Sequence, residues 1–250
     1  MAAVSQDDPT QRPKPDAARP RQDTVRPGAD ARPVRAKAQK PAAEDVRIPR
    51  QMLEVCRNAS LLLGGPNIKR LGVTSALREE GRTSIALAMA VVQREDYGRR
   101  VALVDMDLER PTLARRFGLE PWPGLAELTR REATAEEVLQ PLSDGVLVVP
   151  SGVLGASAAR TMTDIVKADV LTELERHVDV VVADMPPLLG GGPGSSASRA
   201  FREILLVIRA GVTPVARIKE ATDDLPVVPH VLLNDIHTSL PRWLRRLTGR

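Results

Sequence analysis

Three short segments of the sequence carry residue types that could bind a nucleotide and a metal ion. The first runs Ala76-Leu-Arg-Glu-Glu-Gly81-Arg82-Thr83-Ser84 and leads into an apolar helical stretch. A phosphate-binding loop needs a small residue, four variable positions, Gly, Lys and then Ser or Thr, because backbone N–H groups and a helix N-terminus surround the anion while the hydroxyl holds Mg²⁺. Here Ala76 replaces the first glycine and Arg82 replaces the lysine. Taken alone, the segment is equally compatible with an ordinary strand-to-helix turn.

The other two segments place carboxylates at the ends of apolar runs. One ends with Asp105-Met-Asp107, and the other ends with Asp184-Met-Pro-Pro. In nucleotide sites Mg²⁺ is usually held by one or two carboxylates together with phosphate oxygens. Each aspartate alone could be a solvated strand end, but the three segments in this order predict a site for a nucleotide with Mg²⁺.

The apolar runs predict the elements that position these residues. We expect strands over 70–75, 100–106, 145–150, 178–184, 203–209 and 227–234, helices over 83–95, 161–177 and 213–224, and shorter helical pieces over 110–140. Strands that alternate with helices predict a doubly wound, mainly parallel α/β sheet. Ligands of such sheets bind beyond the carboxyl ends of the strands, where the three segments fall.

Composition favours one domain with an aliphatic core. Of the 250 residues only five are aromatic, namely two Phe, two Trp and one Tyr. Cys56 is the only cysteine, so an intramolecular disulfide is excluded and nothing indicates an oxidising compartment. No apolar stretch of ~18 residues and no signal segment is present. We therefore expect a cytoplasmic protein.

The two ends of the chain differ from its middle. Residues 1–47 hold seven prolines and no Leu, Ile or aromatic residue, which predicts a disordered tail ahead of a nucleotide-binding domain over 48–240. Residues 241–250 place Trp243 among four arginines and predict a basic amphipathic segment, which would either rest on anionic lipid or pack on its own domain. The net charge of +4 lies at these ends, since 48–240 hold 22 basic and 25 acidic residues. We expect no nucleic-acid partner.

The three segments resemble the nucleotide motifs of a known family. VTSALREEGRTS, VALVDMDLERP and VVVADMPP, in this order and at these separations, are similar to motifs of the bacterial tyrosine kinases of capsular and exopolysaccharide synthesis, a branch of the MinD/ParA-like P-loop ATPases. The likeness extends over about residues 50–240. It implies a P-loop fold, ATP and Mg²⁺ as ligands, and a role in polysaccharide synthesis or export beside a membrane-embedded chain-length protein.

The resemblance also assigns roles to individual residues. By it, the residues that bind ATP are Ala76, Glu80, Gly81, Arg82, Thr83, Ser84 and Asn234, the last of them near the adenine. The implied metal ligands are Thr83, Asp105 and Asp184, and the implied catalytic residues are Arg82, Asp105 and Asp107.

Several positions depart from the family pattern. Members usually read Pro-Gly-Glu-Gly-Lys where this chain has Arg78-Glu-Glu-Gly-Arg82. A guanidinium needs more room than an ammonium, so we expect ATP binding with impaired phosphate transfer. Glu79 adds a charge and a Cβ where backbone should approach phosphate. The family autophosphorylates a C-terminal tyrosine cluster that this chain lacks, and we interpret its single tyrosine, Tyr97, as a packing or turn residue.

Two further questions stay open at this point. The family has an oligomer-forming helix with Glu followed by Arg three and six positions on; Glu54 and Arg57 match, but Ser60 replaces the second Arg, so a homo-oligomer and a simple Glu–Arg surface pair are both compatible. The alternative functions are a catalytically weak pseudokinase that acts as a nucleotide-dependent switch and a MinD/ParA-type positioning ATPase. The latter ranks last because Leu77 occupies the place of that group's extra lysine.

Overall fold

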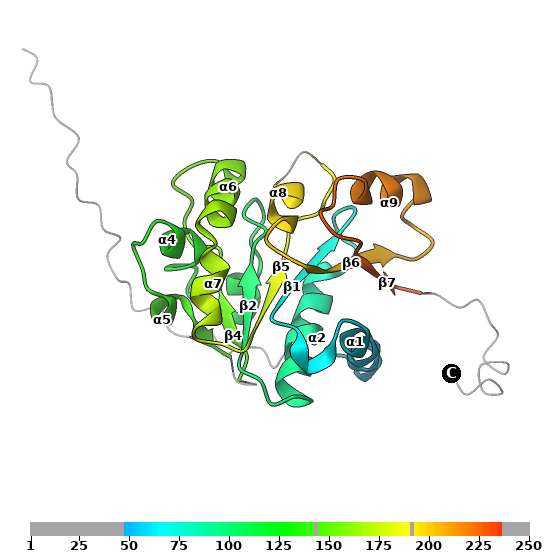
Figure 1. Cartoon of the computed structure of the whole chain (residues 1–250), viewed down its shortest axis with the longest axis horizontal. Helices are drawn as coiled ribbons and strands as arrows, with labels where there is room; N and C mark the ends of the chain where they lie inside the picture. The colour runs from blue at the N-terminus through cyan, green and yellow to red at the C-terminus, as the bar shows by residue number, and fades with distance from the viewer. Residues whose placement is uncertain (1–47, 143–144, 191–192, 237–250) are drawn as a thin grey trace, which may run out of the picture. The chain divides into compact units, whose positions relative to one another are not determined.

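The computed structural model describes residues 48–142, 145–190 and 193–236 (Figure 1). All of them belong to one unit of the chain, residues 40–250. The expected disordered tail over 1–47 and the expected basic segment over 241–250 lie outside the described residues and stay predictions.

The fold is built on a seven-stranded sheet in the described part of the chain. Its strands are β1 (Arg70–Ser75), β2 (Val101–Asp105), β3 (Gln140–Pro141), β4 (Leu147–Val149), β5 (Val180–Asp184), β6 (Glu203–Arg209) and β7 (His230–Asn234). Their order is β3-β4-β2-β5-β1-β6-β7, and every neighbouring pair is parallel except β3 with β4. The predicted doubly wound, mainly parallel sheet is confirmed. Sequence reasoning missed β3, a two-residue edge strand ending in proline that is too short to show alternation.

Helices cover both faces of this sheet. They are α1 (Arg50–Leu62), α2 (Arg82–Glu95), α3 (Leu113–Phe117), α4 (Leu125–Thr129), α5 (Ala135–Val138), α6 (Ala158–Ala168), α7 (Val170–Glu175), α8 (Gly194–Ser198) and α9 (Val215–Thr222), with a 3₁₀ turn at Gly65–Asn67. The single helix expected over 161–177 is wrong, because Asp169 takes a left-handed φ of 45° and separates α6 from α7. A residue in that conformation ends a right-handed helix.

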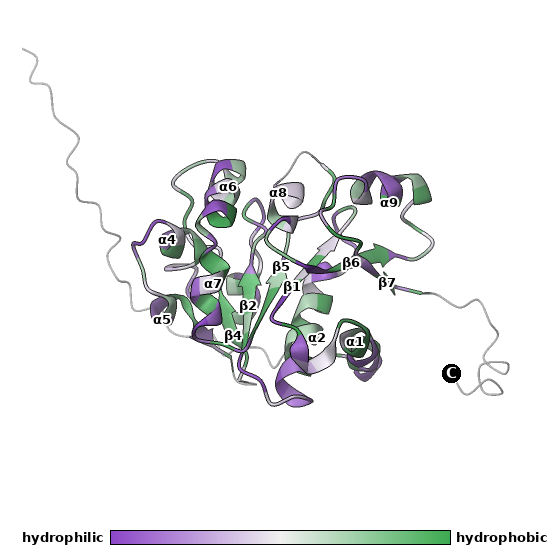
Figure 2. Cartoon of the chain, viewed as in Figure 1, coloured by the Kyte–Doolittle hydropathy of each residue, from purple (hydrophilic) through white to green (hydrophobic). Residues whose placement is uncertain are grey.

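The central strands are buried on both faces, which explains their near-continuous aliphatic sequences. In β1, Leu71 and Val73 pack into the cluster that contains α1 and α2, whereas Gly72 between them lies against Met185 and Phe201 of the opposite cluster. Figure 2 shows β2 and β4 as largely green, hydrophobic ribbons. The alternation of period two therefore divides an aliphatic core into two layers.

The parallel register brings the ends of three strands to one edge of the sheet. Asp105 at the end of β2 is the register partner of Asp184 at the end of β5, and Val73, two residues before the end of β1, is paired with Asp184 on the other side. The loops that follow these strands consequently meet at one place, at the N-terminus of α2.

Candidate functional site

The loop between β1 and α2 bends through two left-handed residues. Glu79 has a φ of 66° and Gly81, the residue before the helix, has a φ of 92°. Positive φ costs a non-glycine residue energy, so glycine would be the ordinary choice at 79. Here glutamate adopts that conformation with its side chain exposed. The backbone therefore keeps a glycine-like bend although the glycine is absent.

Glu80 holds this loop against the neighbouring strand. Its carboxylate is only 3% exposed and accepts a hydrogen bond from Leu77 N at 2.6 Å through Oε2. Through Oε1 it accepts from Arg209 N at 3.2 Å, at the end of β6, and from the Thr213 hydroxyl. We expected Glu80 among the ATP-binding residues; its side chain faces into the protein and braces the loop.

Asn234, at the end of β7, packs on the same loop. Its Nδ2 donates to the backbone oxygen of Glu80 at 3.0 Å, and a Cβ added to Gly81 would overlap that amide nitrogen. The glycine is therefore required both by its φ and by the contact with Asn234. The placement of Asn234 near an adenine stays a prediction.

Asp105 is turned toward the start of α3. Its Oδ2 accepts two backbone hydrogen bonds, from Thr112 N at 2.8 Å and from Leu113 N at 2.9 Å. The other oxygen, Oδ1, is buried and has no hydrogen-bond partner. Burial raises the pKa of Asp105 to about 6, and the two N–H groups oppose that rise. The carboxylate is thus fixed through one oxygen and free at the other.

Asp184 lies beside the first turn of α2. Its Oδ2 accepts from the Thr83 hydroxyl at 2.7 Å, whereas its Oδ1 is buried and without a hydrogen bond. Burial raises the pKa of Asp184 to about 7, with the charge of Arg82 acting in the opposite direction. Two of the implied metal ligands, Thr83 and Asp184, are therefore in direct contact.

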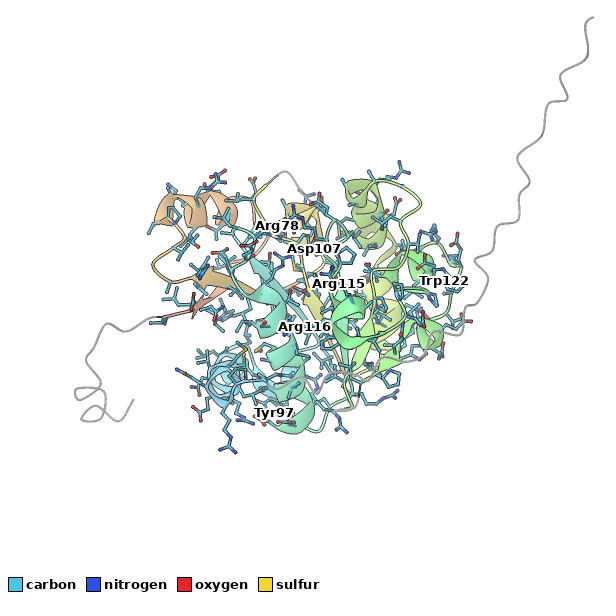
Figure 3. The ribbon with its side chains drawn as sticks, turned by 180° about the vertical axis from the view of Figure 1, so that it is seen from behind. Arg78, Tyr97, Asp107, Arg115, Arg116 and Trp122 are labelled. Atoms are coloured by element: carbon cyan, nitrogen blue, oxygen red, sulfur yellow. The ribbon has the colours of Figure 1, made fainter. Side chains whose placement is uncertain are left out.

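Two arginines of the loop region converge on Asp107. Arg82 Nη2 and Arg78 Nη1 both donate to Asp107 Oδ2, the latter at 2.9 Å, and Arg78 Nη2 also reaches Glu109 at 2.9 Å. Arg82 Nε lies 3.5 Å from Asp184 Oδ1. Figure 3 shows Arg78 beside Asp107 at this end of α2. Sequence reasoning missed Arg78 as a partner of Asp107, because the pair is 29 residues apart and no local pattern joins them.

The remaining predicted residues lie around this centre. Ala76 is fully buried and its backbone oxygen accepts from Leu189 N at 3.1 Å, while Ser84 is half-buried on α2 with Arg116 Nη1 at 3.5 Å from its hydroxyl. A cleft of about 340 Å³ opens beside the loop and is lined by Leu77, Arg78, Glu109, Arg110, Pro187, Leu189 and Gly190. A larger hollow of about 810 Å³ lies among α4, α5 and α7 and contains none of the predicted residues.

The oxygen atoms of the site suit a hard cation. Within the described residues, no three His, Cys, Asp or Glu side chains form a preassembled metal cluster. The two orphaned oxygens, Asp105 Oδ1 and Asp184 Oδ1, are nevertheless the kind of ligand that Mg²⁺ takes, and the Thr83 hydroxyl is hydrogen-bonded to the other oxygen of Asp184. A cation held here would complete its coordination with phosphate oxygens, so the residues fit a nucleotide-linked Mg²⁺.

The residues expected to mediate oligomer contacts make contacts within the chain. Ser60 is fully buried and its hydroxyl accepts from Gln93 Nε2 of α2 at 2.8 Å. Arg57 donates to Asp96 at 2.8 Å. The acceptor of its hydrogen bond is thus Asp96 at the end of α2 and not Glu54, the partner in the simple surface pair that was left open. The position of the family's second arginine therefore faces α2 in this chain.

Tyr97 is a packing residue, as expected. It packs against the cluster of α1 and α2 and lies next to Gly65. Figure 3 places it at the end of α2 opposite Arg78 and Asp107. Since α2 has 14 residues, that end is about 20 Å from the loop.

The sheet order, the loop bent at the start of α2 and the strand-end carboxylates define a P-loop α/β domain. The structure of the kinase domain of VpsO has a TM-score of 0.67 to this chain at 22% identity, covering 75% of this chain and 96% of that one. The kinase domain of Escherichia coli ETK also has a TM-score of 0.67, at 20% identity over 76% and 78% of the two chains. The MinD ATPase of Pyrococcus furiosus has a TM-score of 0.53 at 21% identity, over 72% of this chain and 78% of that one. The fold is shared with all three.

Sequence comparison narrows this class. No family model matches the chain. The tyrosine-protein kinase YwqD of Bacillus subtilis is 28% identical over 170 residues, which are 68% of this chain and 71% of that protein. The succinoglycan biosynthesis transport protein ExoP of Rhizobium meliloti is 25% identical over 193 residues, 73% of this chain but only 24% of that protein. The expected resemblance is confirmed: the chain is related to bacterial tyrosine-protein kinases of the MinD/ParA-like P-loop group.

Proposed function

We propose that the chain is an ATP-binding, tyrosine-kinase-like component of exopolysaccharide or capsular polysaccharide synthesis or export. The observation that carries the proposal is the meeting of Arg82, Thr83 and Asp184 at the start of α2, at the edge where the carboxyl ends of the strands gather. The relatives named as tyrosine kinases and as a polysaccharide transport protein support the biological role.

In this proposal the backbone N–H groups at the start of α2 receive the phosphates, and Gly81 lets the loop approach them closely. Thr83, Asp105 and Asp184 would hold Mg²⁺, which supplies positive charge against the phosphates when bound. Of the two aspartates at and after the end of β2, Asp105 is the one with an oxygen, Oδ1, that is open to either a metal ion or a proton, whereas Asp107 is bound by two guanidinium groups.

A catalytically weak switch is the second candidate, and the position of Arg82 favours it. Its guanidinium is turned onto Asp107 and Asp184 instead of projecting into the cleft. A side chain held there must rearrange before it assists transfer of a phosphoryl group. In this case the chain would bind ATP and change its contacts with a partner without rapid turnover. A MinD/ParA-type positioning ATPase ranks behind both.

The test is to measure Mg-ATP binding and phosphate release for the native chain, for Arg82→Lys and for Asp105→Ala. Exposed Arg176, whose ion pair is with Glu173 on α7, provides the control Arg176→Gln. Ready turnover that Asp105→Ala abolishes supports the kinase-like enzyme. Tight binding with negligible turnover, rescued by Arg82→Lys, supports the switch. Absence of any nucleotide binding by the native chain overturns both.

A phosphate acceptor, where transfer occurs, would be a tyrosine of another protein. The sequence has one tyrosine, and Tyr97 is packed at the far end of α2 from the site. The chimeric protein CapA2B2 shares the fold, with a TM-score of 0.61. We propose a membrane-embedded chain-length protein as the partner, with this chain on the cytoplasmic side.

Membrane contact and self-association are further parts of the proposal. No helix in the described ranges is long and apolar enough to span a bilayer. We propose peripheral contact through Trp243 and the neighbouring arginines. We also propose a homo-oligomer whose contacts differ from the family's helix pattern, since the Ser60 hydroxyl accepts a hydrogen bond from Gln93 within the chain.

A further inference from the structure

A buried guanidinium stands among the carboxylates of the site. The Arg82 side chain is only 10% exposed, and it spans two strands by placing Nη2 on Asp107 and Nε 3.5 Å from Asp184. These two aspartates are 2% and 1% exposed. Removing carboxylates from water is costly unless a positive charge accompanies them. Arg82 supplies that charge.

The charges of the site indicate that the two guanidinium groups stand in for a divalent cation. Of the three buried carboxylates, those of Asp107 and Asp184 contact the guanidinium groups of Arg78 and Arg82, whereas Asp105 contacts neither. The two guanidinium groups on Asp107 together carry the same charge as one divalent cation. A guanidinium also resembles a metal ion in that its separate N–H groups contact several oxygens at once.

We propose that Arg82 occupies the cation position between Asp107 and Asp184, so that a divalent cation enters the site only when the guanidinium leaves. The inference rests on the proposed nucleotide site, since it concerns the carboxylates assigned to that site. The weak contact of Arg82 with Asp184 supports the proposal. Arg82 Nε and Asp184 Oδ1 are 3.5 Å apart and form no hydrogen bond, so we expect this contact to break first when a cation enters.

In consequence the site holds either the Arg82 guanidinium or a divalent metal ion, but not both at once. With Arg82 in place, Asp107 is fully engaged, because its Oδ2 receives both arginines and its Oδ1 accepts from Arg110 N at 3.2 Å. With Arg82 displaced toward a bound phosphate, Asp184 Oδ1 becomes available to a metal ion, in addition to Asp105 Oδ1, which Arg82 does not contact. The native chain therefore has a low affinity for divalent cations in the absence of nucleotide.

The test is a titration of the full chain with Mn²⁺ alone, followed by electron paramagnetic resonance, without nucleotide. Arg82→Gln removes the competing charge and is expected to bind Mn²⁺ at least about tenfold more tightly than the native chain, a change of the size that neighbouring groups usually exert on metal affinity. Arg176→Gln, which removes an exposed guanidinium elsewhere, should bind as the native chain does. Adding Asp184→Asn to Arg82→Gln should abolish the gain.

Equal Mn²⁺ affinity for the native chain and Arg82→Gln overturns the inference. Circular dichroism checks folding, and if Arg82→Gln does not fold, Arg82→Lys serves instead: a single ammonium cannot reproduce the two-pronged contact, so Mn²⁺ should raise the melting temperature of Arg82→Lys but not that of the native chain. No such difference also overturns it. Because no nucleotide is present, a native chain that fails to bind ATP would overturn the proposed function while leaving the Mn²⁺ result to decide the inference.

Discussion

At Gly81 the loop lies so close to Asn234 that a side chain fits only if the Asn234 amide moves. A Cβ there would overlap the Asn234 amide, and the φ of 92° is itself unfavourable for any other residue. Gly81→Ala should lower the free energy of unfolding by about 2–4 kcal/mol, from backbone strain and overpacking together. Urea denaturation measures this loss.

Gly98 offers a matched control, because its φ is 66° but no atom lies within 4 Å of a Cβ added there. Gly98→Ala should therefore cost only the strain, about 1 kcal/mol. Shortening the opposing side chain in Gly81→Ala with Asn234→Ala should recover part of the larger loss. Equal losses for the two glycine variants would contradict the close contact.

Asp184 predicts a dependence of stability on pH. Its pKa is raised from 3.8 to about 7 in the folded chain, so between these values the unfolded chain releases the proton and the folded chain retains it. The contribution of this carboxyl to stability accordingly falls as pH rises from about 4 to 7 and is level above that. Asp184→Asn does not titrate. Its stability relative to the native chain should rise over this window, by on the order of 4 kcal/mol at most.

The measurement is a set of denaturation curves for both chains at pH 4 to 8. Asp164→Asn, at an exposed ion pair with Arg160, gives the control, for which the difference from the native chain should stay small. A difference for Asp184→Asn that does not change with pH would show that the carboxyl is ionised throughout.

The residues of the site were predictable only where their role follows from a position at a strand end or a helix start. Asp105, Asp184 and Thr83 were predicted because each follows a strand or starts a helix, and strand ends meet in a parallel sheet. Arg78 on Asp107 and Glu80 on Thr213 join residues 29 and 133 apart. Such pairings depend on side-chain directions that no spacing in the sequence records.

Among the elements, β1, β2, β4, β5 and β6 were predictable because burial on both faces forces continuous aliphatic runs. The edge strand β7 also has an aliphatic run, although Val231 and Leu233 are exposed. The break between α6 and α7 was not predictable, because Val170, Leu171 and Leu174 continue the apolar pattern of the preceding helix across it. The turn depends on Asp169, which has a left-handed backbone and an ion pair with Arg70 at 2.9 Å. A tertiary contact thus accompanies a turn that periodicity does not show.

Arg70 ties α7 to the start of β1 through several groups. Its Nε donates to Glu175 at 2.6 Å, its Nη2 to Thr172 at 2.9 Å, and its Nη1 to Asp169 and to the backbone oxygen of Ala200. The side chain is 17% exposed. Arg70→Ala should therefore destabilise the chain by about 2–3 kcal/mol, since several partly buried acceptors lose their donor.

The contrast is with Arg160, whose side chain is 72% exposed and pairs only with Asp164 among the described residues. Arg160→Ala should change stability by less than about 0.5 kcal/mol. Thermal unfolding of the two variants beside the native chain makes the comparison. A loss at Arg70 no greater than that at Arg160 would mean that the link between α7 and β1 contributes little.

For the whole molecule, the net charge of +4 is located mainly at the two ends of the chain. Residues 48–240 have three more acidic than basic groups, whereas 241–250 carry four arginines and no acid. Basic residues beside an anionic bilayer each contribute about 1 kcal/mol, and salt screens the attraction. The proposed peripheral contact should accordingly depend on this segment and on the charge of the lipid.

Sedimentation of the full chain with lipid vesicles tests this dependence. The native chain should sediment with vesicles that contain phosphatidylserine and not with pure phosphatidylcholine, and 0.5 M salt, about 4 Å of screening length, should release it. Changing all four arginines of 241–250 to Gln should weaken binding at least about tenfold, given roughly 1 kcal/mol for each. The control removes the same charge from exposed arginines elsewhere, by Gln at Arg131, Arg160, Arg176 and Arg217. If both fourfold variants lose binding equally, attraction is a matter of net charge, and the segment is not the contact.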